Sequence, residues 1–248
     1  MRPIAALFVT SLRQALPVRR TIIFVLIQLI PALVYLLSTQ NRTGAAALES
    51  FVAIGAGMLL GLAVPVVAIV LGAGALGSER RDETLSFIAL RPIPRSALAG
   101  VKTFAAIIAA TAIGLIGALA LGVAHVVEHG NASLIVAMAI AVFVTASLYT
   151  SVLVPLGFLT DRAVLIAMVY LFIFEGGVVS ALPALATISP WRIGLSIFGA
   201  VASDPPPILD ELMGSLTPSA IAPLVAVVVV YAVSVAFTTV MLRQRDLA

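Results

Sequence analysis

Six long apolar runs, separated by short polar stretches, dominate the pattern of the chain. At a rise of about 1.5 Å per helical residue, each run is long enough to cross about 30 Å of hydrocarbon. The pattern therefore predicts an all-α integral membrane protein with six transmembrane helices, which form a single transmembrane domain over residues 1–248. The predicted spans are 21–38, 51–76, 103–125, 133–159, 163–182 and 219–242.

The segment before the first span, residues 1–20, has a different pattern. Its apolar residues recur every three or four positions, with polar residues off this stripe, which predicts an amphipathic helix lying in the membrane interface. Pro17 would end this helix, and Arg19 and Arg20 would anchor it. A cleaved signal peptide is the alternative, but no small-x-small cleavage site directly follows the next apolar run. We interpret the segment as a retained anchor.

The connection between spans five and six, residues 183–218, is too long and too apolar for a plain loop. Prolines interrupt it repeatedly, yet the run from Ile193 to Val201 is apolar enough to dip into the membrane. The segment therefore predicts a re-entrant or interface-lying hairpin on the outer face of the protein.

Composition supports the membrane assignment, and the charges orient it. Hydrophobic residues make up 62% of the chain and charged residues only 10%, with a mean hydropathy of +1.20, whereas soluble proteins carry about 25% charged residues. If the N-terminus is cytoplasmic, only Arg42 and Arg192 of the 14 basic residues fall outside, as the positive-inside rule requires. Both termini are therefore expected in the cytoplasm, and the net charge of +3 calls for no nucleic acid partner. The basic residues placed inside are Arg2, Arg13, Arg19, Arg20, Arg80, Arg81, Arg91, Arg95, Lys102, Arg162, Arg243 and Arg245.

The sequence also excludes several kinds of chemistry. It contains no cysteine, so disulfides, thiol catalysis and cysteine-ligated metals are excluded. It contains no phosphate-binding motif of the form G-x-x-x-x-G-K-[ST], which nucleotide-hydrolysing domains use to hold phosphates. If ATP powers this protein, another chain binds the nucleotide.

The passage 77–102 is the only charge-dense part of the chain. Ser78, followed by acidic residues, predicts a helix start with a capping hydroxyl. Leu85 and Ile88 then fall at helical spacing, and Pro92 would end the segment. The pattern predicts a short cytoplasmic helix between two spans, in a position to receive force from a soluble partner.

The motifs of this passage resemble the loop between the second and third spans of type-2 ABC exporter permeases. They are Ser-Glu-Arg at 78–80, Glu-Thr-Leu at 83–85 and Arg-Pro-Ile-Pro-Arg at 91–95. In that family, a coupling helix at this place docks on an ATPase subunit. The resemblance implies that this coupling role belongs to Glu79, Arg80, Arg81, Glu83, Thr84, Leu85, Ile88 and Arg91.

The same resemblance implies the wider assembly. It predicts a non-catalytic permease in the bacterial cytoplasmic membrane, paired with a second permease subunit, identical or paralogous. Two ATPase subunits would bind ATP and Mg, and this chain itself would hold no cofactor. The complex would export a lipid, a drug or a peptide-like substrate by alternating access.

Glu175 is the acidic residue expected deepest in the bilayer. It lies 13 residues beyond Arg162, about 20 Å along a helix, and an ionisable group at that depth is a functional candidate. We assign it to the substrate pathway together with Gln28 and Pro65. Glu175 would favour cationic cargo or pair with Arg192; alternatively, span five is tilted and Glu175 reaches the headgroups.

His125, Glu128 and His129 form an H-x-x-E-H pattern at the outer end of span three. Positions i, i+3 and i+4 share one face of a helix, so the three side chains are weak candidates for a metal site. No further ligand is evident apart from acids of the last outer loop. We therefore favour a polar cap at the interface, with no metal.

Three other functions remain open at this stage. A stand-alone secondary transporter would use Glu175 in substrate or ion coupling, although such proteins usually carry several buried ionisable groups. A membrane-embedded enzyme would depend on the cluster at His125. The third is a membrane scaffold that transports nothing.

Overall fold

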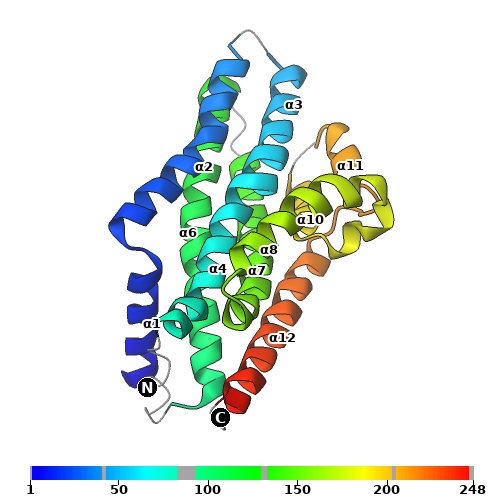
Figure 1. Cartoon of the computed structure of the whole chain (residues 1–248). Coiled ribbons are helices and arrows are strands. Elements are labelled where there is room, and N and C mark those ends of the chain that lie inside the picture. Colours follow the sequence, from blue (N-terminus) through cyan, green and yellow to red (C-terminus); the bar gives the residue numbers. More distant parts are fainter. Residues whose placement is uncertain (1, 41–42, 83–92, 130–132, 203–204, 246–248) are drawn as a thin grey trace.

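The computed structural model describes residues 2–40, 43–82, 93–129, 133–202 and 205–245, and within these ranges the chain is helical, with no strand (Figure 1). The elements are α1 (Arg2–Ala15), α2 (Val18–Ser38), α3 (Ala45–Ile54), η1 (Gly55–Ala63), α4 (Val64–Arg81), α6 (Arg95–His129), α7 (Ser133–Leu159), α8 (Ala163–Val169), η2 (Tyr170–Val178), α9 (Val179–Ala181), η3 (Pro183–Ile188), α10 (Pro190–Val201), α11 (Ile208–Met213) and α12 (Ile221–Arg245). The segments η1 and η2 are π-helical.

Five helices of the described chain are long and apolar enough to cross a membrane, which confirms five of the six predicted spans. They are Val18–Ser38, Ala45–Arg81, Arg95–Val127, Ser133–Leu159 and Ile221–Gln244. The predicted fifth span corresponds to α8, η2 and α9, of which Ala163–Val178 forms a shorter apolar helix. A sixth crossing therefore stays a prediction.

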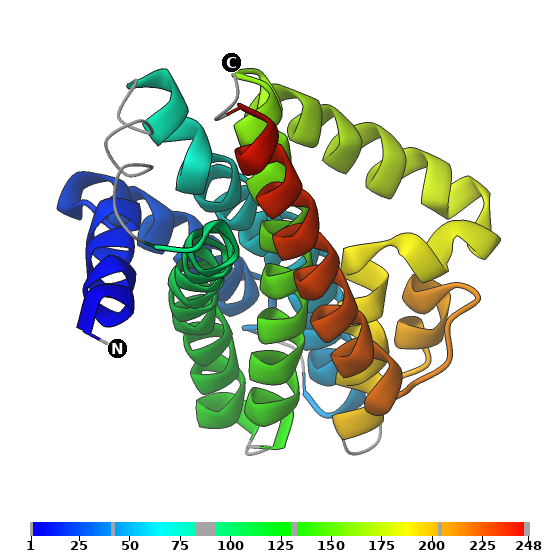
Figure 2. The same cartoon turned by 90° about the horizontal axis from the view of Figure 1, so that it is seen from below.

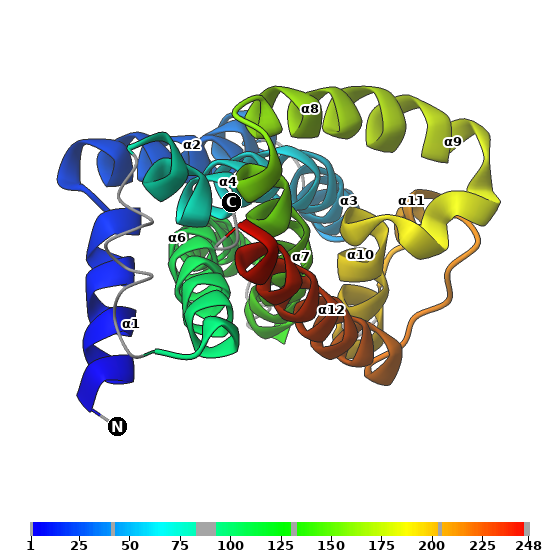
Figure 3. The ribbon, with the colours of Figure 1, turned by 60° about the horizontal axis from the view of Figure 1, so that its bottom comes forward.

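Helix α7 lies at the centre of the bundle and packs against α4, α6, α10 and α12. Helix α1 lies at one side and α8–α9 at the other, as the view along the bundle shows (Figure 2). In both rotated views, α10 and α11 occupy the region between α9 and α12 (Figures 2 and 3). Helix α1 begins and α12 ends at the same end of the bundle.

Glycines bring the backbones of α4 and α7 into direct contact. A Cβ added at Gly157 would overlap the backbone of Ala73, and one added at Gly77 would lie 2.7 Å from the carbonyl oxygen of Gly157. Small residues allow this close approach, which dispersion forces then stabilise. The two helices are therefore held at a fixed distance near the end of α4.

Helix α4 continues past Ser78 to Arg81, so the prediction of a helix start at Ser78 is wrong. The Ser78 hydroxyl does not cap a new helix but donates to the carbonyl oxygen of Gly74 at 2.6 Å. The helical ladder of the second span extends unbroken to this point, and a serine inside a helix satisfies its hydroxyl in this way. The remainder of the expected coupling helix, 83–92, lies outside the described residues.

The two irregular segments of the sequence are helical as well. The expected interfacial segment contains α1, which ends before Pro17 and packs against α6 and α4. In the outer connection, Ser189 caps α10 by accepting a hydrogen bond from the backbone amide of Arg192, and Pro190 follows at the first helical position, as is typical of helix starts. How α1 and α10 lie relative to a bilayer stays a prediction.

Candidate functional site

Glu175, in η2, is buried, with only 2% of its surface exposed. Its carboxylate accepts hydrogen bonds from the Tyr149 hydroxyl at 2.8 Å, the Tyr170 hydroxyl at 3.3 Å and Ser189 Oγ at 2.5 Å. Burying a carboxylate is costly, and several donors offset that cost. Glu175 therefore joins α7, η2 and Ser189, the N-cap residue of α10.

A cavity of about 330 Å³ adjoins this cluster. Tyr149 and Tyr170 belong to both the cavity and the cluster, whereas Glu175 itself is not among the described residues that line the cavity. The other walls are almost entirely apolar, from α4, α7, α8 and the outer connection; they include Ile69, Leu153, Ala167 and Pro190. A ligand here would meet apolar walls and two tyrosines positioned by the carboxylate behind them.

Arg192 is close in sequence to this cluster, but it forms no ion pair with Glu175 in the described structure. Its guanidinium carbon lies 5.5 Å from the ring centroid of Trp191, over the ring face, within cation–π range. Its backbone amide donates to Ser189 Oγ at 3.2 Å. Ser189 thus links the two residues, because the same hydroxyl donates to Glu175.

Trp191 fixes α10 to the second span. Its Nε1 donates to the carbonyl oxygen of Ala56 at 2.7 Å, and a Cβ at Gly61 would lie 3.4 Å from the indole ring. Ala56 and Gly61 both belong to the π-helical segment η1, where the widened turn alters the ladder and π-bulges often mark functional sites. Sequence reasoning missed this contact; the signal was that Trp191 is the sole tryptophan.

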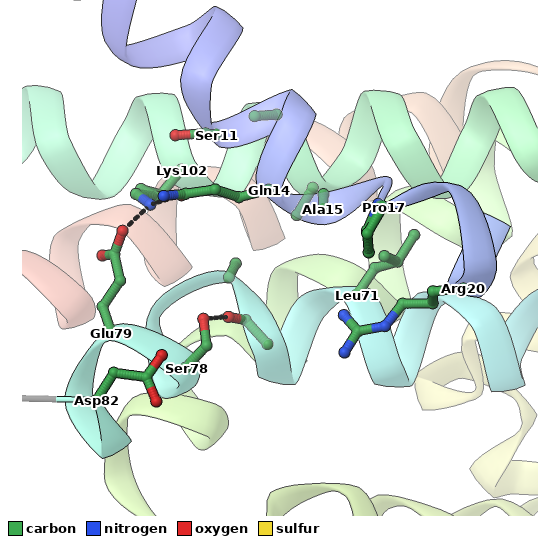
Figure 4. Close-up of a pocket in the computed structure, with 14 residues that line it drawn as sticks. Ser11, Gln14, Ala15, Pro17, Arg20, Leu71, Ser78, Glu79, Asp82 and Lys102 are labelled. Carbon is green, nitrogen blue, oxygen red and sulfur yellow. Dashed lines mark hydrogen bonds and ion pairs between the residues drawn. The ribbon is translucent and has the colours of Figure 1, made fainter. Parts of the chain in front are cut away.

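At the end of α4, two ion pairs tie the helix to its neighbours. Glu79 and Lys102 of α6 form a buried pair, and Lys102 Nζ also donates to Gln14 Oε1 of α1 at 3.3 Å (Figure 4). Arg80 pairs with Asp161. It also donates to the carbonyl oxygens of Phe158 and Leu159, at 3.1 and 2.8 Å, at the end of α7.

The expected coupling residues thus fall into three groups. Glu79 and Arg80 are engaged within the protein, and Arg81 is exposed. The others lie outside the described residues: Glu83, Thr84, Leu85, Ile88 and Arg91.

Comparison with known families identifies the protein class. Residues 17–181, about two-thirds of the chain, match the model of a family described as ABC-2 family transporter protein. The chain belongs to this family. A comparison with curated proteins finds no match. The family assignment confirms the resemblance read from the charged passage and makes the chain a multi-pass membrane transport permease.

In this ABC-2 membrane protein, Gln28 and Pro65 do not line the cavity beside Glu175. Gln28 is fully buried, and its Nε2 donates to the carbonyl oxygen of Ala63 at 3.1 Å. Pro65 is buried at the start of α4. Their assignment to the substrate pathway stays a prediction, whereas the contact of Gln28 joins α2 to the second span.

His125 lies in an aromatic cluster at the other end of the bundle. Its Nδ1 lies 2.8 Å from the Tyr35 hydroxyl, and its ring centroid lies 4.7 Å from that of Phe51. The side chains of Glu128 and His129 lie outside the described structure. Among the residues described, no group of three potential ligands could hold a metal ion.

Proposed function

We propose that this ABC-2 family protein is the membrane-spanning subunit of an ATP-driven exporter in the bacterial cytoplasmic membrane, with both termini in the cytoplasm. Two permease subunits, identical or paralogous, would act with two ABC ATPase subunits. The family match over 17–181 is the observation that carries this proposal. The chain has no phosphate-binding motif of its own, so ATP and Mg would be bound by the ATPase partner.

The contacts at the end of α4 support a route for coupling. A force applied to the segment 83–92 would reach α4 at Asp82. From there, Glu79–Lys102 carries it to α6, and Arg80 carries it to the end of α7. Because α4 is continuous with η1 and α3, the same displacement reaches the carbonyl that holds Trp191. Movement of packed helices as units is typical of such transitions.

The cavity beside Glu175 supports an amphipathic cargo, such as a lipid, a drug or a peptide-like molecule. Its walls are apolar, and the two tyrosine hydroxyls at its edge are engaged with Glu175. Apolar pockets with a few convergent polar groups are typical ligand sites. Outward opening would separate α10 from η1 and expose this cavity.

The test is co-purification of an ATPase from native membranes. The tagged wild type is compared with the variant Glu83→Arg/Leu85→Asp, and with Glu49→Arg as a charge-reversal control on exposed surface of α3. We expect the wild type and the control to retain an ATPase and the double variant to lose it. Retention by all three would refute the docking residues. Absence of an ATPase from every sample, including cross-linked ones, would refute the exporter assignment.

A stand-alone secondary transporter is the second candidate, because the buried acid Glu175 is the kind of group that such proteins use for ion coupling. Its carboxylate is engaged by three hydroxyls, which favours a positioning role instead. Proteoliposomes with the permease alone and an imposed pH gradient distinguish the two. Substrate uptake that is abolished by Glu175→Gln would support the second candidate.

A further inference from the structure

A second cavity, of about 370 Å³, lies at the end of the bundle where α4 terminates. It is enclosed by α1, α4 and α6, and the start of α2 also lines it (Figure 4). Its volume falls within the range of about 300–1,000 Å³ typical of small-molecule sites. Unlike the cavity beside Glu175, it has a strongly polar lining, with Ser11, Gln14, Arg20, Glu79, Asp82 and Lys102.

Four charged side chains line this cavity, and two of them are paired with each other. Glu79 and Lys102 neutralise each other as a buried pair. Arg20 and Asp82, which are exposed and belong to different helices, also line the cavity. Within the described chain, neither side chain makes a hydrogen bond or an ion pair. The cavity thus offers one positive and one negative group to a ligand that carries both charges.

Ser11 adds to this cavity a hydroxyl that is available to a ligand. Only 6% of its surface is exposed, and its Oγ makes no hydrogen bond to any described residue. A serine in a helix usually bonds back to a carbonyl of the preceding turn, as Ser78 does on the opposite wall. A buried hydroxyl without a partner is unfavourable unless a ligand or a water molecule supplies one.

An apolar groove borders the same bend between α1 and α2. The groove encloses about 350 Å³ and is lined by Leu16, Val18, Thr21, Ile22, Val25 and Leu26. Pro17 and Arg20 line the polar cavity, so the residues of the two sites alternate along the bend. A ligand that occupies both must have a charged head and a hydrocarbon tail.

We propose that the two sites together bind one phospholipid with a zwitterionic, amine-bearing headgroup. Its phosphate would bind Arg20, its ammonium group would bind Asp82, and one acyl chain would lie in the groove along α2. Arg20 and Lys102 stand at the ends of apolar runs, which is the depth of lipid headgroups. An anionic headgroup would bring its extra negative charge close to Asp82, and the site disfavours it for that reason.

The experiment measures lipid binding to the full-length protein by native mass spectrometry in mild detergent. The probes are phosphatidylethanolamine, phosphatidylglycerol and soluble glycerophosphoethanolamine. The variants are Arg20→Gln and Asp82→Asn, with Arg19→Gln as the matched control, because exposed Arg19 does not line the cavity.

We expect the wild type and Arg19→Gln to bind phosphatidylethanolamine at least about tenfold more tightly than phosphatidylglycerol. Each cavity variant should lose about tenfold in affinity, as expected when a charge-assisted hydrogen bond is removed. Asp82→Asn should also reduce the preference for phosphatidylethanolamine over phosphatidylglycerol.

Three results would overturn the proposal. The first is equal affinity of the wild type for the two lipids, which requires no variant to fold. The second is an equal loss in Arg19→Gln and Arg20→Gln, which would indicate general surface charge. The third is equal affinity for the soluble headgroup, which would identify the ligand as a small phosphate ester instead of a lipid. The inference does not depend on ATP-driven transport, so it can fail or succeed separately from the proposed function.

Discussion

The helix Ala45–Arg81 is held by different chemistry in its two halves. At the Arg81 end, charged side chains form the ion pairs Glu79–Lys102 and Arg80–Asp161. In the first half of the helix, up to its midpoint at Ala63, neutral donors bind single backbone carbonyls, with Trp191 on Ala56 and Gln28 on Ala63. Within hydrocarbon, carbonyl groups that the helix leaves free need such partners.

Because of this difference, we expect the Arg81 end of the helix to be less mobile than the contact between α10 and the second span. At the Arg81 end, backbone contact between α4 and α7 adds to the ion pairs, so α4, α6 and the end of α7 are expected to move together. By contrast, α10 packs on α7 through its buried face, and its link to the second span depends on the hydrogen bond from Trp191 to Ala56. Breaking one such hydrogen bond costs only about 0.5–1.5 kcal/mol. We therefore expect α10 to separate from the second span while the opposite end stays intact.

Removing one member of the buried ion pair should have the largest effect. Glu79→Leu leaves the Lys102 ammonium buried, with Gln14 as its remaining acceptor. Stranding a buried charge costs about 3–5 kcal/mol, and we expect the free energy of unfolding to fall by about 3 kcal/mol. Chemical denaturation in mild detergent, followed by circular dichroism, measures the loss.

The matched control for this variant is the double variant Glu79→Leu/Lys102→Met. Replacing a buried pair by apolar residues of similar size is often neutral, so most of the lost stability should return. If the double variant is as unstable as Glu79→Leu, packing and not charge determines stability at this end of the helix.

Removing the Glu175 carboxylate, which binds the N-cap of α10, should have an intermediate effect on stability. Glu175→Ala leaves the hydroxyls of Tyr149, Tyr170 and Ser189 without their acceptor. Unsatisfied buried polar groups cost about 1–3 kcal/mol each, and we expect a loss of about 2 kcal/mol, because α10 can separate and expose these groups to water.

The sole tryptophan makes this separation measurable. Release of Trp191 from Ala56 should shift its fluorescence to longer wavelength and increase quenching by iodide. Glu211→Ala serves as the control, since Glu211 is exposed in α11. Loss of stability without any change in Trp191 emission would show that Glu175 supports the cluster without holding α10.

The sequence predicts the spans well because apolar length and helical rise are local properties. Five of the predicted spans are confirmed, whereas the depth of Glu175 in a bilayer stays a prediction. Local signals mislead at Ser78, where a capping pattern lies inside a helix that continues to Arg81. The Ser78 hydroxyl fits a capping pattern in the sequence, but in the structure it bonds back to Gly74 of the preceding turn.

Contacts between residues far apart in the sequence cannot be predicted from local patterns. Trp191 and Ala56 are separated by 135 positions, and periodicity indicates only which face of a helix is apolar. The partners expected for Glu175 were a substrate or Arg192, whereas the structure supplies hydroxyls from α7, η2 and the outer connection. Hydroxyls are frequent in membrane helices, so composition alone does not select these three.

Disrupting the pair Arg80–Asp161 should have the smallest effect on stability. It also distinguishes the contribution of the ion pair at the Arg81 end from that of the carbonyl contacts made by Arg80. Asp161 is 63% exposed, and exposed ion pairs contribute about 0–1 kcal/mol. We expect Asp161→Ala to lower the free energy of unfolding by less than about 0.5 kcal/mol, because water screens the pair. Arg80→Ala should cost more, about 1 kcal/mol, since it also removes the bonds to the carbonyls of Phe158 and Leu159. Denaturation at low and high salt separates the two contributions: the effect of Asp161→Ala should vanish in high salt, and that of Arg80→Ala should largely persist. Equal losses in the two variants would mean that the exposed charge pair, and not the carbonyl contacts, fastens α4 to α7.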